Sequence, residues 1–278
     1  MGGAFSAVDY YTIIRDAKSS GESTSNRTLI LDALGYNECM TELLYQTDAY
    51  LKQFSATVLS SDAETRAVVL DRSAFYPGGG GQPCDVGTLE SGGVTYTVEK
   101  VKKQGDDVLH FLGGTEPLPA AGSASSGTLD WVRRFKLMRT HTALHVLCGV
   151  VFRDYGAKVT GGDMEPLKGR MDFEFETMRG ELVREIEAAV NLEVRQGRAI
   201  QVKILPREEV FQIPDLIRTK INLLPEGILQ VRTVEIIGLD LQADGGTHVA
   251  NTSEVGTVKV TDYKSKGAIN KRIYIEVE

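Results

Sequence analysis

The sequence predicts an α+β protein in which a small N-terminal antiparallel β-barrel precedes a domain of helices packed on an antiparallel sheet. Short β-prone runs separated by turns fill residues 40–130. From Trp131 onward the apolar residues recur with helical spacing, and later segments return to strand-like alternation. Because these two periodicities distinguish helices from strands, we expect two domains, 40–130 and 131–278.

The composition is that of a globular protein with its own core. The chain has 278 residues, of which 42% are hydrophobic and 25% charged. No apolar run approaches the roughly 20 residues of a membrane span. The formal net charge of −7 argues against binding nucleic acid by bulk charge but leaves room for a local basic face. Three scattered cysteines argue against a disulfide framework and favour a reducing, cytoplasmic location.

Residues 1–39 are expected to form a flexible N-terminal extension without a function of its own. Lys18–Asn26 is polar and rich in small residues, which is typical of a mobile segment. Tyr10–Asp16 could form one short helix. The start of the chain lacks the basic and apolar segments of a secretory signal.

Four β-prone runs define the first domain: Ala56–Leu59, Ala67–Leu70, Val94–Val98 and Val108–Leu112. Their near-regular spacing predicts a small antiparallel barrel or sandwich. Residues 121–127, rich in serine, alanine and glycine, form either a linker or an edge strand. We therefore place the domain boundary near residue 130.

The second domain is expected to place two helices over about five strands. The first helix runs over 131–155 with Gly156 as its C-cap, and the second over 178–196. The expected strands are Met171–Phe175, Gln201–Leu205, Leu229–Ile237, Gly256–Asp262 and Arg272–Val277.

Three of the four histidines lie in two segments that together suggest a metal site. His141 and His145 are four residues apart in the first expected helix, so both imidazoles lie on one face. Asp244 and His248 flank a Gly-Gly pair that favours a tight loop over a helix. Nitrogen and oxygen ligands make zinc the first choice, and three protein ligands with one open position describe a catalytic site. The alternative is that the histidines pack or cap the helix and bind no metal.

A run of four glycines, Gly78, Gly79, Gly80 and Gly81, marks a loop within the barrel region. It allows close approach of the backbone to a ligand and leaves amide N–H groups free. No Gly-Lys-Ser/Thr follows, so this is not a P-loop. Gln82 is the one adjoining side chain able to contact a substrate amide or hydroxyl, and a flexible hairpin loop is the simpler interpretation.

Basic residues cluster directly before the histidine pair: Arg133, Arg134, Lys136 and Arg139. A second basic group follows near the C-terminus: Lys264, Lys266, Lys271 and Arg272. Phosphate contacts are one interpretation and a solvated surface is the other. No nucleophile elbow, dinucleotide fingerprint or kinase signature is present. With a metal and no evident nucleophile, direct attack by water is the natural chemistry.

The motifs taken together resemble those of alanyl-tRNA editing domains. The segments that carry the resemblance are Tyr45–Tyr50, Phe75–Pro83, Arg133–Leu147 and Asp244–Val249. The resemblance covers about residues 40–278, and three motifs in order make it specific. Since no aminoacylation or adenylate-forming region is recognised, the chain is most similar to the free-standing AlaX-type editing proteins of medium length, which carry an added N-terminal barrel.

The resemblance implies hydrolysis of the ester in mischarged tRNA(Ala), chiefly seryl-tRNA(Ala) with glycyl-tRNA(Ala) as the alternative, with the tRNA acceptor end as partner and one Zn²⁺ per chain. His141, His145 and His248 fall on its ligand positions. Asp244 stands where the family commonly has cysteine, so either Asp244 or a water completes the site. Thr160 resembles the threonine that faces the misacylated serine, and Gln82 a glutamine near the substrate.

Two other functions remain compatible with the sequence. One is a zinc hydrolase of small aminoacyl or peptide esters that needs no tRNA. The other is a non-catalytic RNA-binding module with a vestigial metal site, which Asp244 in place of cysteine makes conceivable. The oligomeric state stays open between monomer and homodimer.

Overall fold

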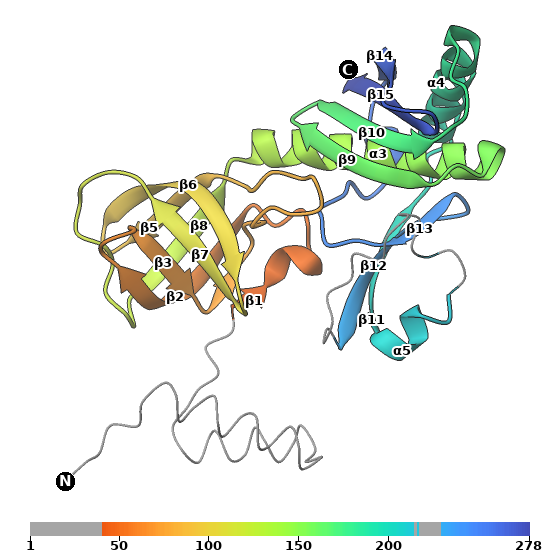
Figure 1. The fold of residues 1–278 in the computed structure, drawn as a ribbon. Coiled ribbons are helices and arrows are strands. Elements are labelled where there is room, and N and C mark those ends of the chain that lie inside the picture. Colours follow the sequence, from red (N-terminus) through yellow and green to blue (C-terminus); the bar gives the residue numbers. More distant parts are fainter. Residues whose placement is uncertain (1–40, 214–215, 217–228) are drawn as a thin grey trace. The chain divides into compact units, whose positions relative to one another are not determined.

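The computed structural model describes residues 41–213, 216 and 229–278. Within this part the chain is α+β, as predicted, and begins with a closed antiparallel β-barrel (Figure 1). The extension predicted for residues 1–39, including the helix at Tyr10–Asp16, lies outside the described residues. None of the described helices is long and apolar enough to cross a membrane.

Six strands close the barrel in the order β2-β3-β7-β6-β5-β8, and each is antiparallel to its neighbours. The strands are β2 (Gln53–Asp62), β3 (Ala67–Leu70), β5 (Gly87–Ser91), β6 (Val94–Gln104), β7 (Asp107–Leu112) and β8 (Ala124–Leu129). Closure confirms the barrel and removes the sandwich alternative. Within the segment 121–127, residues 124–127 belong to β8, which pairs with both β2 and β5, so this part is neither a linker nor an edge strand.

Alternation along several barrel strands places apolar side chains in the core, while all four residues of β3 are buried. In β2, Phe54, Ala56 and Val58 are buried while the residues between them are exposed. The short parallel pair β1 (Glu42–Leu43) and β4 (Arg72–Ser73), with the 3₁₀ turn η1 (Leu44–Gln46), lies next to the barrel in sequence. The loop that carries the four glycines leaves after β4 and returns at β5.

Helix α3 (Trp131–Tyr155) runs through the second region and matches the predicted helix at both ends. The Asp130 side chain accepts from the Arg133 amide at the N-terminus, and Gly156 at the C-terminus has φ +66°. Its middle, from Thr140 to Val151, is buried throughout. The predicted domain boundary near residue 130 stays a prediction, although β8 ends at Leu129 and α3 begins two residues later.

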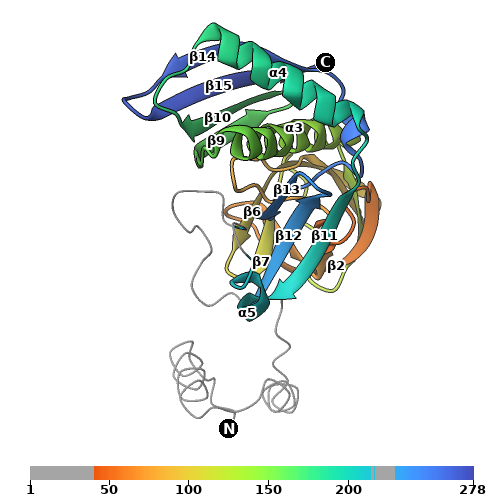
Figure 2. The same cartoon turned by 90° about the vertical axis from the view of Figure 1, so that its right-hand side faces the viewer.

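A four-stranded antiparallel sheet, in the order β14-β15-β10-β9, packs against α3 and α4 (Gly180–Arg195). Its strands are β9 (Val159–Glu165), β10 (Lys168–Glu174), β14 (Val258–Ser265) and β15 (Asn270–Val277). Helix α3 contacts β9 and β10, and α4 contacts β14 (Figure 2). Helix α3 lies between this sheet and β13 in both views.

The prediction of one sheet with about five strands is wrong, because seven strands form two separate sheets. The second sheet contains β11 (Ile200–Pro206), β12 (Gln230–Ile236) and β13 (Asp240–Ala243), with α5 (Arg207–Val210) after β11 and η2 (Thr252–Glu254) after β13. Strands β9 and β13 were not anticipated. Two central glycines weaken the strand signal of β9, and β13 has only four residues.

Candidate metal centre

Four donor side chains converge between α3 and the loop that follows β13. His141 and His145 come from α3, and Asp244 and His248 from that loop, with one potential ligand atom of each within 4.8 Å of the others. All three imidazoles are nearly fully buried, and their ring centroids lie 4.3–4.9 Å apart. The structure therefore brings together all four residues that the sequence proposed as ligands.

The Gly-Gly pair explains how the loop approaches the helix so closely. A Cβ atom on Gly246 would collide with the ring of His141 and would lie 2.7 Å from Oε1 of Gln82. Asp244 and His248 are four residues apart, but they lie in an irregular loop, as the two glycines predicted. Glycine at position 246 is thus required by contact with a candidate ligand.

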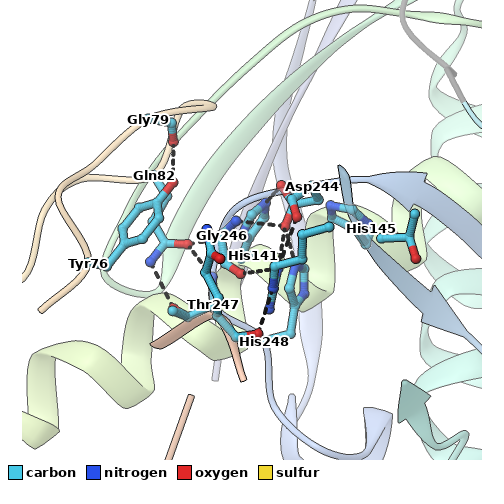
Figure 3. A network of polar contacts seen from close by, with 12 residues as sticks. Tyr76, Gly79, Gln82, His141, His145, Asp244, Gly246, Thr247 and His248 are labelled. Carbon is cyan, nitrogen blue, oxygen red and sulfur yellow. Dashed lines mark hydrogen bonds and ion pairs between the residues drawn. The ribbon is translucent and has the colours of Figure 1, made fainter. Parts of the chain in front are cut away.

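Each of the three histidines has its Nδ1 atom held by a different protein group (Figure 3). Nδ1 of His141 lies 3.0 Å from Oε1 of Gln82, and Nδ1 of His145 lies 3.1 Å from Oδ2 of Asp240. Nδ1 of His248 lies 3.2 Å from Oγ1 of Thr142. Since carboxamide and carboxylate oxygens only accept, Nδ1 of His141 and His145 carries the proton and Nε2 carries the lone pair.

Asp244 faces the Nε2 atoms. Its Oδ2 accepts from the amide of Gly246 at 2.9 Å and lies 2.9 Å from Nε2 of His248, while Oδ1 lies 3.7 Å from Nε2 of His141. The loop is held from outside by Arg232, which donates to the carbonyl oxygens of Asp244 and Gly246 at 3.0 and 2.8 Å. The carboxylate therefore has a fixed direction toward the imidazoles.

Burial and charge decide the protonation of the cluster. Burial lowers the pKa of His141 well below its usual value and that of His248 to about 4. At His145 burial also opposes the charge, but the hydrogen bond to Asp240 and the nearby Asp244 outweigh it and raise the pKa. Burial would raise the pKa of Asp244, yet the neighbouring imidazoles hold it well below its usual range. An ionised carboxylate beside imidazole lone pairs is a set of metal-binding groups.

These residues fit a divalent metal ion. Three imidazole nitrogens and one carboxylate oxygen are a donor set that zinc and neighbouring transition metals accept. Partners that hold the second nitrogen of each ligating histidine are the usual surroundings of such sites. The cluster could therefore hold a metal through His141, His145, His248 and Asp244.

A pocket of about 490 Å³ opens next to the cluster. Its walls come from α3, from β9 and β10, from the end of β13 and from the glycine loop of the barrel. Besides His141, His145 and Asp244, they include Gly80, Gly81, Leu144, Val159, Thr160, Gly161, Gly162, Asp163, Met164, Met171, Gln242 and Ala243. Thr160 is exposed, and its hydroxyl donates to Oδ1 of Asn270 at 3.0 Å. The volume suits a small ligand.

The glycine loop is a tight, ordered turn and forms one wall of this pocket. Gly79 and Gln82 exchange two backbone hydrogen bonds, and Gly78, Gly79, Gly80 and Gly81 all have positive φ. The carbonyl of Gly81 accepts from the Met164 amide in β9 at 3.1 Å. A Cβ atom on Gly81 would lie 3.0 Å from the carbonyl oxygen of Gly162, so glycine permits this close approach.

Gln82 is buried next to the loop that follows β13 and carries Asp244 and His248, which we call the metal-site loop. Its side chain is buried, with Nε2 donating to Thr247 Oγ1 at 2.9 Å and Oε1 accepting from the Thr247 amide at 3.0 Å. The same Oε1 accepts from His141. The residue expected to contact a substrate therefore contacts a candidate metal ligand.

One of the basic residues is not at the surface, so the assignment of Arg134 to tRNA binding is corrected. Arg134 is completely buried, forms an ion pair with Asp85 of the barrel, and donates to the carbonyl oxygens of Ala49 and Ala74. It joins α3 to the barrel, where no phosphate can reach it. Arg133 donates to the Cys84 carbonyl.

The remaining basic residues lie closer to solvent. Lys136 is half-buried, while Lys264 and Lys266 are exposed, Lys264 lying 2.9 Å from Asp262. Arg139 donates to the carbonyl oxygens of Val255 and Glu278.

Sequence reasoning missed three residues that hold the histidines and the loop, Thr142, Arg232 and Asp240, and it missed Gln242, which donates to Asp240. Asp240 and Gln242 alternate along β13 and so share a face, but the strand itself was not anticipated. Arg232 lies in an expected strand, where a buried position for a charged residue is unusual, but the strand also contains Glu235 and the sequence did not single out Arg232. The spacing of the histidines predicts the metal ligands but not the residues that form hydrogen bonds with them.

Two family models match the chain. The model described as "Threonyl and Alanyl tRNA synthetase second additional domain" matches residues 231–274, which include Asp244 and His248. The model described as "tRNA synthetases class II (A)" matches residues 12–133, which include the barrel.

Comparison of the sequence with known proteins finds relatives that match most of this chain. The "Alanyl-tRNA editing protein AlaX-M" of Methanosarcina barkeri is 37% identical over 84% of this chain and 98% of its own length. That of Saccharolobus solfataricus is 37% identical over 86% of this chain and 100% of its own length. The "Alanine--tRNA ligase" of Ignicoccus hospitalis is 37% identical over 79% of this chain but only 24% of its own length.

Proposed function

The chain belongs to the AlaX-M family of alanyl-tRNA editing proteins, and from this relationship we propose that it deacylates mischarged tRNA(Ala), chiefly seryl-tRNA(Ala). The observation that carries the proposal is the buried cluster of His141, His145, Asp244 and His248 at the wall of a pocket of about 490 Å³. A substrate bound in that pocket would contact the candidate metal-binding side chains that line it, His141, His145 and Asp244.

The proposed cofactor is one zinc ion per chain, held by His141, His145, His248 and Asp244. The donor set supports zinc, and the carboxylate of Asp244 is a harder ligand than the cysteine common at this position. When bound, the metal would supply a positive charge that polarises the ester carbonyl or a water molecule.

The reaction is hydrolysis of the aminoacyl ester. The oxygen of water bonds to the ester carbonyl carbon, the bond from that carbon to the ribose oxygen breaks, and the ribose oxygen gains a proton. Among the described residues that line the pocket there is no serine or cysteine, and the one hydroxyl, that of Thr160, donates to Asn270. This supports direct attack by water over a covalent intermediate. The protein's own part is to hold the ester against the cluster within partly apolar walls formed by Leu144, Met164 and Met171.

Thr160 is proposed to favour serine. Its hydroxyl proton is used by Asn270, so the Thr160 oxygen can accept from the hydroxyl of a bound serine. Alanine offers no such donor. Thr160 keeps its hydrogen bond to Asn270 whether serine or alanine is bound. The preference for serine therefore comes from the additional hydrogen bond between the serine hydroxyl and Thr160, which is worth about 1 kcal/mol. The glycine loop, Gly78 to Gly81, forms another wall of the pocket through Gly80 and Gly81 and would limit the size of the bound aminoacyl group.

The tRNA acceptor end is the proposed partner, contacted by Arg133, Lys136 and Arg139 near the start of α3 and by Lys264 and Lys266 at the end of β14. Arginines that donate to one or two carbonyls retain further N–H groups for phosphate oxygens. Because the net charge is −7, binding depends on these local groups, and its affinity should fall as salt rises.

The direct test is release of serine from seryl-tRNA(Ala), compared with a seryl ester of adenosine that lacks the tRNA. Turnover that needs the tRNA supports editing, whereas equal turnover of both esters supports a hydrolase of small aminoacyl esters. His145→Ala should lose bound metal and deacylation together, while His110→Gln in the barrel should keep both. Tight tRNA binding without metal or turnover would support the vestigial binding module.

A further inference from the structure

One buried carboxylate joins a candidate metal ligand to the pocket wall. Oδ2 of Asp240 lies 3.1 Å from Nδ1 of His145 and 2.7 Å from Nε2 of Gln242. Asp240 is buried at the start of β13, whereas Gln242 lines the pocket. The same carboxylate oxygen therefore accepts from both groups.

The amide of Gln242 has a defined orientation. The carboxylate of Asp240 can only accept, so the group of Gln242 that faces it is the NH₂. That nitrogen also lies 3.3 Å from the Sγ atom of Cys148 on α3. With the nitrogen held on this side, the side-chain oxygen is the atom that Gln242 can present to a ligand in the pocket.

The two periodicities of β13 and α3 make this arrangement possible. Asp240 and Gln242 are two residues apart and share one face of the strand. His145 and Cys148 are three residues apart and share one face of the helix. The elements approach closely because position 149 of α3 is glycine: a Cβ atom there would lie 2.8 Å from Cγ of Leu239 and 3.1 Å from Cβ of Asp240.

We propose that Asp240 is a positioning residue that fixes the tautomer of His145 and, through Gln242, aims an acceptor oxygen into the pocket. The groups that this oxygen would receive are the hydrogen-bond donors of an aminoacyl ester, its ammonium or its hydroxyl. The second half of the proposal rests on the proposed function, but the first half concerns metal binding alone. Asp240 itself does not contact the substrate.

Two variants separate the halves of the proposal. Asp240→Asn removes the charge on the acceptor and should weaken zinc binding roughly 10- to 100-fold, as measured by competition with a chelator. Gln242→Met keeps the volume, and it should leave zinc affinity within about threefold while raising KM for the aminoacyl ester about tenfold at similar kcat. Each preparation is checked for folding by circular dichroism.

Glu193→Gln is the matched control, because Glu193 of α4 is a buried carboxylate that accepts from Arg153 near the end of α3 and from Arg198 just after α4. It should lose stability without any change in zinc affinity. A readout on the unaltered protein is the ¹⁵N spectrum of its histidines with zinc bound. We expect His145 to give the pattern of an imidazole with Nδ1 protonated and Nε2 on the metal. That pattern should change in Asp240→Asn and stay the same in Gln242→Met.

Unchanged zinc affinity in Asp240→Asn would overturn the positioning role, and so would an Nδ1–metal bond at His145 in the unaltered protein. Equal loss of zinc in Gln242→Met and Asp240→Asn would overturn the division of roles. An unchanged KM in Gln242→Met would overturn the acceptor role of its oxygen. Since the zinc measurements use no tRNA, a failure to deacylate seryl-tRNA(Ala) would count against the proposed function and not against the positioning of His145.

Discussion

Gln82 of the barrel and Thr247 of the metal-site loop exchange two hydrogen bonds, of 2.9 and 3.0 Å, across 165 positions of sequence. The oxygen of Gln82 that accepts from Thr247 also accepts from His141. The barrel therefore contributes directly to the candidate metal centre. Its glycine loop is a structural part of the site as well as a wall of the pocket.

Gln82→Leu should weaken the metal centre. The change leaves the Thr247 amide and Nδ1 of His141 buried without an acceptor, which costs about 1–3 kcal/mol for each group. It also frees the His141 ring to adopt the other tautomer. We expect zinc affinity to fall roughly 10- to 100-fold, measured by chelator competition. Gln53→Leu on the outer face of the barrel is the control, and unchanged zinc affinity in Gln82→Leu would contradict the role given to this contact.

Asp244→Cys should shift metal preference toward softer ions. A thiolate favours cadmium over zinc more strongly than a carboxylate does. The substitution also removes the acceptor for the Gly246 amide, so the loop should lose some stability. The measurement is the ratio of cadmium to zinc affinity of both proteins by chelator competition, and sulfur-to-cadmium charge-transfer absorption in the variant reports the new thiolate bond. The same ratio in both proteins would show that residue 244 is not a ligand.

Thr160→Val should reduce the preference for serine while zinc stays bound. Valine keeps the shape of threonine but cannot accept a hydrogen bond, so seryl-tRNA(Ala) loses about 1 kcal/mol of transition-state binding, which is about fivefold in kcat/KM. Hydrolysis of alanyl-tRNA(Ala) should change little. A preference that survives in the Thr160→Val variant would place serine recognition elsewhere in the pocket.

Arg134→Met should mainly reduce stability, whereas Arg133→Met should mainly reduce tRNA affinity. Arg134 is buried with Asp85, and removal of one partner leaves an uncompensated charge, which costs about 3–5 kcal/mol of unfolding free energy. Arg133 is only part-buried and donates to a carbonyl, so its loss should change stability by about 1 kcal/mol or less. Urea unfolding measures the first effect, and tRNA affinity over a salt series measures the second. Equal stability of the two variants would contradict the buried pair.

His110 should make the barrel sensitive to acid. Burial lowers its pKa from 6.5 to about 4, and the neutral ring contacts the Ser73 hydroxyl and the Val68 carbonyl. Above pH 6.5 the ring is neutral in both folded and unfolded chains. As pH falls from 6.5 to about 4 only the unfolded chain gains the proton, so unfolding free energy drops by up to about 3 kcal/mol. His110→Gln should flatten this part of the stability profile, and an unchanged profile would contradict it.

The sequence predicted the elements whose signal is local. Helix α3 has long apolar periodicity, an aspartate before its first turn and a glycine after its last, and both ends were placed correctly. Barrel strands such as β2 and β7 alternate because one face is buried. The spacing of His141 and His145, with the glycines before His248, was enough to bring the four candidate ligands together.

What the sequence could not supply depends on contacts between distant segments. Strand β13 has four residues and is defined by its pairing with β12, so Asp240 and Gln242 had no local signal. The burial of Arg134 depends on Asp85, which lies 49 positions earlier. The direction of the Gln82 side chain depends on a loop near the other end of the chain.

The measurement that tests the central claim most directly is deacylation of seryl-tRNA(Ala) and alanyl-tRNA(Ala) side by side, with zinc quantified on the same sample. The proposed function predicts fast loss of serine, slow loss of alanine and one zinc per chain. Metal-free protein that deacylates seryl-tRNA(Ala) at the full rate would contradict the role of the metal centre, and zinc-loaded protein that leaves seryl-tRNA(Ala) intact would contradict the editing function.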